Sequence, residues 1–273
     1  MWTEITRPQY ERSGLRYASD LRDEEWNMIA PYLPARKRVG RPRTTDLREV
    51  LNAILYMART GCQWRMLPKE FPPRSTIQRY FYAWRSDGTL HALNHHLLMA
   101  AREAAGREAS PSAGVIDSQS VKTTESGGIR GFDAAKLVKG RKRHIITDTG
   151  GLLVGAMVHA ADIQDRDGAP ALLASIRSAF PWLRHVFADG GYAGPKLMEA
   201  LAKLGTWTLE IVKRSDTAKG FVLLPRRWVV ERTFAWFGRN RRLAKDFEKT
   251  IESAEAWLLI ASIQLLTRRI ARA

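Results

Sequence analysis

The spacing of apolar residues changes along this chain at residues 107–112, a short polar stretch with the sequence REASPS. Before this stretch, apolar side chains recur at the three- and four-residue intervals of one helix face, as in residues 45–60. After it, short apolar runs are separated by turn residues, which is typical of strands. The change predicts two domains, a small all-α one over residues 1–109 and an α/β one over residues 110–273.

The second part begins with an apolar strand at residues 113–118, followed by a hairpin of residues 142–147 and 152–160. Helices then alternate with strands at residues 185–188 and 207–212, and a long helical pattern begins at residue 225. This order predicts a mixed sheet flanked by helices. Ligand chemistry in such sheets lies at strand ends, where side chains leave the core.

The first part contains a helix, a turn and a second helix over residues 45–88. The second helix carries Gln78, Arg79 and Arg85, whose side chains could read base edges in a major groove. A packed helical hairpin with exposed basic side chains explains the same pattern. Both interpretations stay open on this segment alone.

The charge of the chain favours a polyanionic partner. There are 44 Lys and Arg against 28 Asp and Glu, which gives a formal net charge of +16. Binding nucleic acid would neutralise phosphates and release counterions. An apolar run long enough to span a membrane and a signal peptide are both missing, so we expect a cytoplasmic, nucleoid-associated protein without membrane contact. The single cysteine, Cys62, excludes a cysteine-based zinc site within one chain.

Acidic residues follow two of the apolar strands. Asp117 comes after Val115-Ile116, and Asp189 follows the run at residues 186–188 and precedes Gly190-Gly191. A third candidate, Glu231, lies in the long helical pattern. Carboxylates without a His/Cys cluster suit Mg²⁺ or Mn²⁺, and a pair of such ions can drive phosphodiester chemistry.

Spacing alone leaves other acids in competition with these three. The rivals are Asp148, Asp162, Asp165 and Asp167. Asp148 lies in a predicted turn, where Asp is favoured locally. Asp165 and Asp167 lie where a helix begins, where acids complement the helix dipole. A serine hydrolase is disfavoured, because no Gly-x-Ser-x-Gly motif occurs.

Several long motifs resemble one family over nearly the whole chain. They are GVIDSQSVKTTESGG, GFDAAKLVKGRKRHIITDTGGLL, VHAADIQDRDGA, FADGGYAG and RRWVVERTFAWFGRNRRLAKDFE, with LRDEEWNMIAPYLP and TGCQWRMLP in the first part. They are similar to bacterial insertion-sequence transposases of the DDE type, in insertion-sequence family five within the family-four-like superfamily. The resemblance implies a ribonuclease-H-like catalytic domain, with the acidic triad at Asp117, Asp189 and Glu231 and two bound Mg²⁺ or Mn²⁺ ions.

The family signature around its Glu implies a phosphate contact by Arg227. Its Tyr and Lys positions are Leu224 and Gly238 here, so we expect the charge to come from Arg239, Arg241 or Arg242. Further phosphate contacts are expected from the basic residues between the first two strands, although a solvated basic face is the alternative for about half of them. These residues are Lys122, Lys136, Lys139, Arg141, Lys142 and Arg143.

The resemblance implies a DNA transposase that binds element ends, cleaves phosphodiester bonds and joins the 3′-hydroxyl to target DNA. Its expected partners are double-stranded DNA and a second copy of the chain in the synaptic complex. The alternatives are a metal-dependent nuclease of the same fold, a non-catalytic DNA-binding regulator and an inactive relic. Strand-transfer assays of triad variants separate these alternatives.

Overall fold

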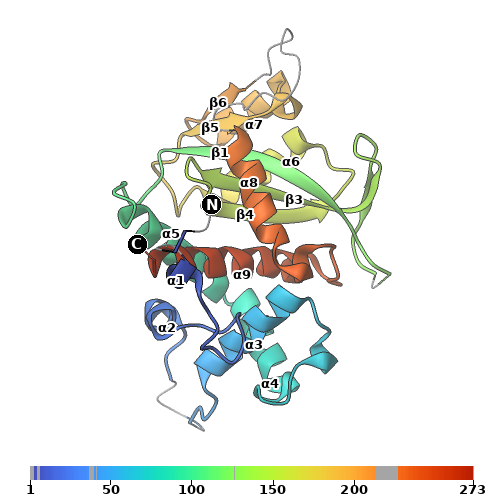
Figure 1. Cartoon of the computed structure of the whole chain (residues 1–273). Coiled ribbons are helices and arrows are strands. Elements are labelled where there is room, and N and C mark those ends of the chain that lie inside the picture. Colours follow the sequence, from blue (N-terminus) through green and yellow to red (C-terminus); the bar gives the residue numbers. More distant parts are fainter. Residues whose placement is uncertain are drawn as a thin grey trace.

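A computed structural model describes residues 3–4, 7–36, 40, 42–125, 127–212 and 227–272. The chain folds into a sheet with helices on both sides, and the helices of the first hundred residues lie below it in Figure 1. Within the described ranges, no helix is both long enough and apolar enough to cross a membrane.

The first part is helical, as its apolar spacing predicts. Its helices are α1 (Arg7–Tyr10), α2 (Asp23–Ile29), α3 (Leu47–Thr60), α4 (Arg74–Ser86) and α5 (Thr89–Glu103). The side chain of Asp46 caps α3 by accepting from the backbone N–H of Arg48, and Gly61 ends the helix in the left-handed conformation at φ 70°. Residues 61–73, including a short 3₁₀ turn at Trp64–Met66, connect α3 to α4.

The second part holds one mixed sheet. Its strands are β1 (Ala113–Lys122), β2 (Gly131–Asp133), β3 (Val138–Asp148), β4 (Leu153–Ala160), β5 (His185–Ala188) and β6 (Thr208–Ile211). The strand order is β2-β3-β1-β5-β6, and β4 also pairs with β3. The pairings of β3 with β1, β2 and β4 are antiparallel, whereas β5 is parallel to β1 and β6 is parallel to β5.

Four longer helices accompany the sheet. They are α6 (Asp165–Ile176), α7 (Pro195–Leu204), α8 (Arg227–Gly238) and α9 (Ile251–Ile270). Residues 225 and 226, where the long helical pattern begins, lie outside the described residues. The pattern is divided in the structure, because residues 239–250 leave the helix and their carbonyls at Leu243 and Lys245 accept hydrogen bonds from Arg143 of β3. In Figure 1, α8 crosses one face of the sheet.

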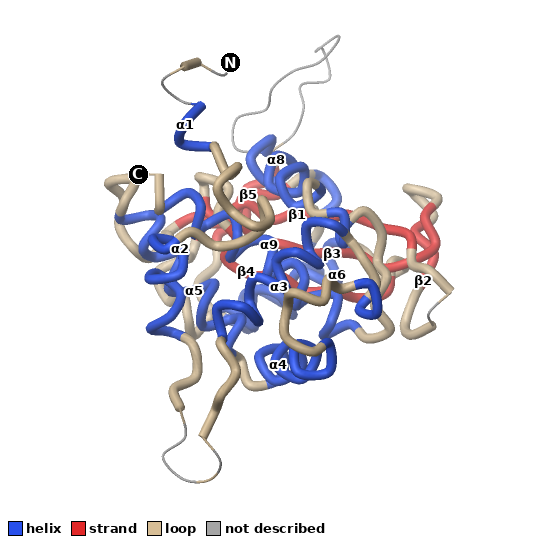
Figure 2. Tube along the Cα trace, turned by 60° about the horizontal axis from the view of Figure 1, so that its bottom comes forward, coloured by secondary structure: helices blue, strands red, loops and turns tan. Residues whose placement is uncertain are grey.

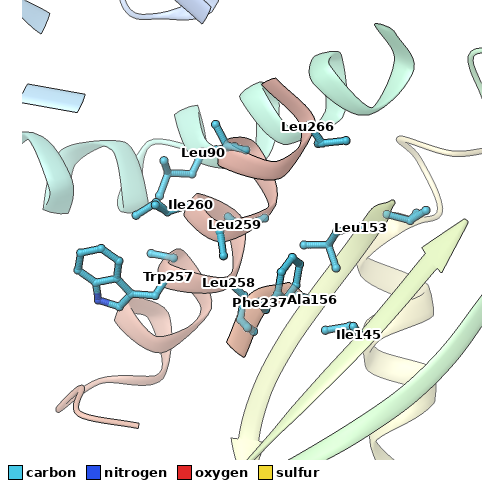
Figure 3. Packing of buried hydrophobic residues seen from close by; sticks show 14 of the residues in the cluster. Leu90, Ile145, Leu153, Ala156, Phe237, Trp257, Leu258, Leu259, Ile260 and Leu266 are labelled. Atoms are coloured by element: carbon cyan, nitrogen blue, oxygen red, sulfur yellow. The ribbon is translucent and has the colours of Figure 1, made fainter. Parts of the chain in front are cut away.

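Helix α9 is the centre of the hydrophobic core. It packs on α5, α4 and α3 from the first part and on β4 of the sheet. Figure 3 shows Trp257, Leu258 and Ile260 of α9 among side chains from α5, α8, β3 and β4. One hydrophobic cluster therefore includes residues of both parts of the chain, from Leu21 to Leu266. The division into domains at residues 109 and 110 stays a prediction.

Candidate active site

Two of the predicted acids lie side by side on neighbouring inner segments of the sheet, where the pairing of β1 with β5 ends. The parallel register of β1 and β5 pairs Val115 with Phe187. Asp117 lies two residues further along β1, and Asp189 lies two residues after Phe187, where the backbone is still extended just past the end of β5. Residues two apart on a strand point to the same face, so both carboxylates leave the same side of the sheet. Together with Val115, Phe187 and Val212, they line one small hollow.

The position of Asp117 after an apolar run predicts that this residue ends its strand, and that prediction is wrong. Strand β1 continues to Lys122, because β3 pairs with it up to that residue. Asp117 instead lies just beyond the last residue that pairs with β5. Because β5 is shorter than β1, Asp117 lies beside the point where β5 ends, although β1 itself continues.

The two carboxylates repel each other, and a bound cation would relieve that repulsion. Burial, followed by the charge of Asp189, raises the pKa of Asp117 to about 7, against the opposing hydrogen bond from the backbone N–H of Ser118. Asp189 accepts a hydrogen bond from the backbone N–H of Gly191 at 2.8 Å. Carboxylate oxygens are the ligands that hard divalent ions prefer. The two aspartates therefore fit such an ion chemically.

Glu231 lies on α8, the helix that packs against β1 and β3. Its neighbour Val230 is fully buried, Thr233 bonds to the carbonyl oxygen of Gly151 at 2.8 Å, and Glu231 itself is exposed. Within the described part of the chain, no three His, Cys, Asp or Glu side chains form a group that could hold a metal ion. The structure thus brings together Asp117 and Asp189, and the role of Glu231 stays a prediction.

A third acid near the pair is Asp165, which the sequence analysis names as a rival to the triad and places where a helix begins. Its carboxylate accepts from Ser118 Oγ at 2.7 Å and from Lys142 Nζ at 2.9 Å. Burial pushes its pKa up, but these hydrogen bonds outweigh burial and keep the pKa below the usual value. A Cβ added to Gly191 would meet both Asp189 and Asp165, so the two carboxylates approach the same turn.

A buried chain of hydrogen bonds holds the turn after Asp189. Tyr192 bonds to His144 Nε2 at 2.7 Å, His144 Nδ1 lies 3.4 Å from His159 Nε2, and His159 Nδ1 lies 2.9 Å from the carbonyl oxygen of Ala160. Because a carbonyl only accepts, the direction follows: His159 donates to Ala160, His144 donates to His159, and Tyr192 donates to His144. Burial, then the neighbouring His159, lowers the pKa of His144 to about 3, which keeps it neutral.

Local sequence does not single out His144, His159 or Tyr192 as members of this hydrogen-bonded chain. The one available signal is that Tyr192 directly follows the Gly190-Gly191 turn. The alternation of β3 and β4 places both histidines on one face, but their contact with residue 192 depends on how the helices pack.

Four of the residues predicted to contact DNA instead form buried hydrogen bonds or ion pairs within the protein. Arg141 is fully buried, pairs with Asp246 at 3.1 Å and donates to the carbonyl oxygen of Ile129 at 2.7 Å. Lys142 binds Asp165 and the carbonyl oxygen of Ile163. The two others are Arg143, which holds the loop before α9, and Arg242, which pairs with Glu248 and reaches the carbonyl oxygen of Cys62. Their charges stabilise the fold, and we leave them out of the proposed DNA surface.

The remaining predicted contacts differ in exposure. Arg85 donates to Ser253 Oγ of α9 at 2.8 Å, and Gln78 is half-buried. The side chain of Arg227 lies outside the described residues. Exposed side chains are those of Arg79, Lys122, Lys136, Lys139, Arg239 and Arg241. Lys136 donates to the carbonyl oxygen of Ser118 at 3.2 Å, which places its charge beside Asp117.

Comparison with known proteins connects this geometry to a family. A family model described as "Transposase DDE domain" matches residues 108–266, and one described as "Putative transposase of IS4/5 family" matches residues 21–94. No solved structure matches the chain.

Three curated relatives are also similar to the chain. The "Putative transposase for insertion sequence element IS402" of Burkholderia cepacia is 30% identical over 49% of this chain and 66% of the relative. A 16.2 kDa uncharacterized protein of insertion element IS402 is 34% identical over 38% of this chain and 74% of the relative. An uncharacterized protein of Sinorhizobium fredii is 36% identical over 31% of this chain and 65% of its own length. The chain thus spans just under two thirds of two of these relatives. With the family match over more than half of its residues, the chain belongs to the transposase DDE domain family, as an insertion-sequence transposase of the IS4/5 type.

Proposed function

We propose that this chain cleaves phosphodiester bonds at the ends of an insertion element and joins the freed 3′-hydroxyl to target DNA. The observation that carries the proposal is the adjacency of Asp117 and Asp189 just beyond the point where the parallel pairing of β1 with β5 ends. Two carboxylates in this arrangement concentrate negative charge where a polyanionic substrate must bind, which a bound cation resolves.

The strand arrangement supports a ribonuclease-H-like core. Three antiparallel strands, β1, β3 and β4, are followed by β5 and β6, which add in parallel on the other side of β1. This is the fold that the family resemblance implies. In that fold, as the resemblance implies, the first and second acids of the triad belong to neighbouring strands and the third to a helix.

In this proposal, Asp117, Asp189 and Glu231 hold two Mg²⁺ or Mn²⁺ ions. Such ions activate a water or a 3′-hydroxyl and stabilise the leaving oxygen. The relay from Tyr192 to His159 fixes the turn that orients Asp189. Lys142 and Ser118 hold Asp165 beside the same turn, and Lys142 compensates its charge.

DNA binding is proposed for the exposed basic residues and for the outer face of α4. Ser75, Arg79 and Tyr82 lie on one exposed side of that helix at spacings of four and three residues. Arg227 is proposed to contact a phosphate, as the family signature implies. Because two element ends must be brought together, we also propose that a homodimer forms in the synaptic complex.

The test is a strand-transfer assay on DNA that carries the terminal repeats flanking the gene. Asp117→Asn, Asp189→Asn and Glu231→Gln should each lower joining by at least about a hundredfold while the far-UV spectrum and DNA affinity stay near wild type. The control is Glu103→Gln, which removes an exposed acid at the end of α5 and should leave joining unchanged. Direct Mn²⁺ titration by calorimetry should show weaker binding for the two Asp variants.

The outcomes separate the alternatives. Wild-type joining by all three variants would refute the triad. Cutting without joining by the wild-type chain would favour a nuclease, and sequence-specific binding without cutting would favour a regulator.

A further inference from the structure

Exposed apolar side chains gather around the β2–β3 hairpin, next to the candidate active site. Ile129 is 62% exposed, Phe132 is 51% exposed and Leu137 is 74% exposed. Ile163 is 39% exposed and belongs to a neighbouring loop, since Asp162 contacts Gly131 closely. Four of the eleven large exposed hydrophobic residues in the described part of the chain therefore lie at this one margin. Figure 2 shows β2 at the edge of the molecule.

The hairpin holds these side chains outward. Phe132 pairs with Lys139 across the strands, so both lie on the same face, which is exposed. Leu137 lies in the turn with φ 52° and is the one residue other than glycine with positive φ in the described ranges. The left-handed conformation is unfavourable for leucine, so the remainder of the hairpin must enforce it.

A network of polar contacts anchors the base of the hairpin beside the acids. Asp133 is buried, accepts from Ser120 Oγ of β1 at 2.5 Å and accepts from the backbone N–H groups of Ala135 and Lys136 at 3.1 Å. Lys136 then reaches back to the carbonyl oxygen of Ser118. The polar base of the hairpin thus contacts Ser118 and Ser120 of β1, one and three residues after Asp117.

The charge around the apolar residues identifies the partner. Arg130, Lys136 and Lys139 are exposed within this hairpin segment, and the chain as a whole carries +16. A second copy of the same basic surface would be repelled, whereas a DNA backbone would be attracted. Exposed apolar side chains with a basic surround match nucleic acid whose bases are unstacked, because an aromatic ring stacks on a base and lysines contact phosphates.

We propose that Phe132 and Leu137, which we call the hairpin tip, bind unpaired bases of the DNA beside the scissile phosphate. The inference rests on the proposed function, because that function brings DNA to Asp117. Phe132 stacks on a base, Leu137 fills the space left in the base stack, and Lys139 contacts the neighbouring phosphate. The hairpin tip thereby selects DNA that is distorted at the cleavage point.

The experiment compares two DNA probes in EDTA at one fixed salt concentration. One is a paired 30-base-pair duplex, and the other is the same duplex with four central mismatches and one 2-aminopurine. Wild-type protein should bind the mismatched probe about fivefold more tightly or better, the factor given by stacking worth about 1 kcal/mol per base, and should quench 2-aminopurine. Phe132→Ser/Leu137→Ser should bind both probes equally, with its affinity for the paired duplex within about twofold of wild type.

The matched control is Trp182→Ser. Trp182 is 65% exposed and lies just before β5, at the opposite end of that strand from Asp189. This variant should keep the full preference and the quenching. A double variant that keeps the preference, or a wild-type chain that has none, would overturn the inference. So would a double variant that changes sedimentation of the free protein but not DNA preference, because the surface would then be a contact between copies.

The two proposals fail separately. A chain that prefers mismatched DNA through the hairpin tip but never cuts contradicts the proposed function alone. A chain that cuts and joins, while its double variant keeps the mismatch preference, contradicts the hairpin inference alone.

Discussion

Asp148 distinguishes a structural acid from a catalytic one, and its replacement by Asn tests that distinction. Its carboxylate is fully buried in the β3–β4 turn, where Oδ1 accepts from the backbone N–H groups of Gly150 and Leu152 at 2.8 Å. Its other oxygen pairs with Arg102 of α5, whose side chain is also buried. The pair joins the helical first part to the sheet.

Asp148→Asn keeps an oxygen for the two turn amides but leaves the Arg102 guanidinium without its partner charge. Arg107, at 3.6 Å and largely exposed, adds little. Leaving one member of a buried ion pair uncompensated costs about 3–5 kcal/mol. For a chain of this size, each 1 kcal/mol lowers Tm by about 2–4 °C, so we expect a loss of roughly 10 °C.

Circular dichroism melts measure the change, and strand transfer well below Tm measures activity. Asp167→Asn is the control, because Asp167 pairs with the exposed Lys196 at 2.7 Å, and such surface pairs contribute about 0–1 kcal/mol. Arg102→Met should lower the free energy of unfolding much less in the Asp148→Asn variant than in the wild-type chain, because the Asp148 charge that it would leave unpaired is already absent. An unchanged Tm together with abolished joining would refute the reasoning and make Asp148 a catalytic acid.

Three further substitutions test other parts of the structure. Arg141→Met strands the buried charge of Asp246 and should cost about 3–5 kcal/mol in urea unfolding while leaving the DNA affinity of the folded protein unchanged; a lost affinity with normal stability would return Arg141 to the DNA surface. Gly140→Ala would place a Cβ 2.0 Å from the carbonyl oxygen of Val121, so we expect a loss of at least about 1–3 kcal/mol, and a variant as stable as wild type in thermal melts would contradict the β1–β3 register. Burial, with the charge of Glu252, raises the pKa of Glu255 to about 7, so the folded chain binds an extra proton and its stability falls as pH rises from about 4.5 to about 7. Glu255→Gln should therefore increase the free energy of unfolding by up to about 3 kcal/mol above pH 7 and leave it unchanged below pH 4.5. An equal increase at both pH values would exclude this cause.

Much of the fold is predictable from local sequence because its signals are local. The apolar spacing of residues 45–60 and the cap and stop at Asp46 and Gly61 produce α3 with little help from distant residues. The strands at residues 142–147 and 152–160 form the predicted hairpin, and the strand at residues 185–188 is observed with the same bounds. The pattern also places Asp117 and Asp189 directly after apolar runs, whereas the parallel pairing of β1 with β5 that brings them together is a feature of the tertiary structure.

The sequence by itself thus determined the order of helices and strands and the family, and through the family resemblance it indicated Asp117 and Asp189 as candidate acids. Only the tertiary structure decided which charges serve the fold. Strand alternation puts Arg141 and Arg143 on one face of β3, but whether that face meets solvent depends on residues 243–250, about a hundred positions later. Burial of a charge requires a distant partner, as Asp246 is for Arg141, and no local pattern records that pairing. For the same reason the sequence, which places Asp165 only at the start of a helix, does not record its contacts with Ser118 and Lys142 beside the candidate site.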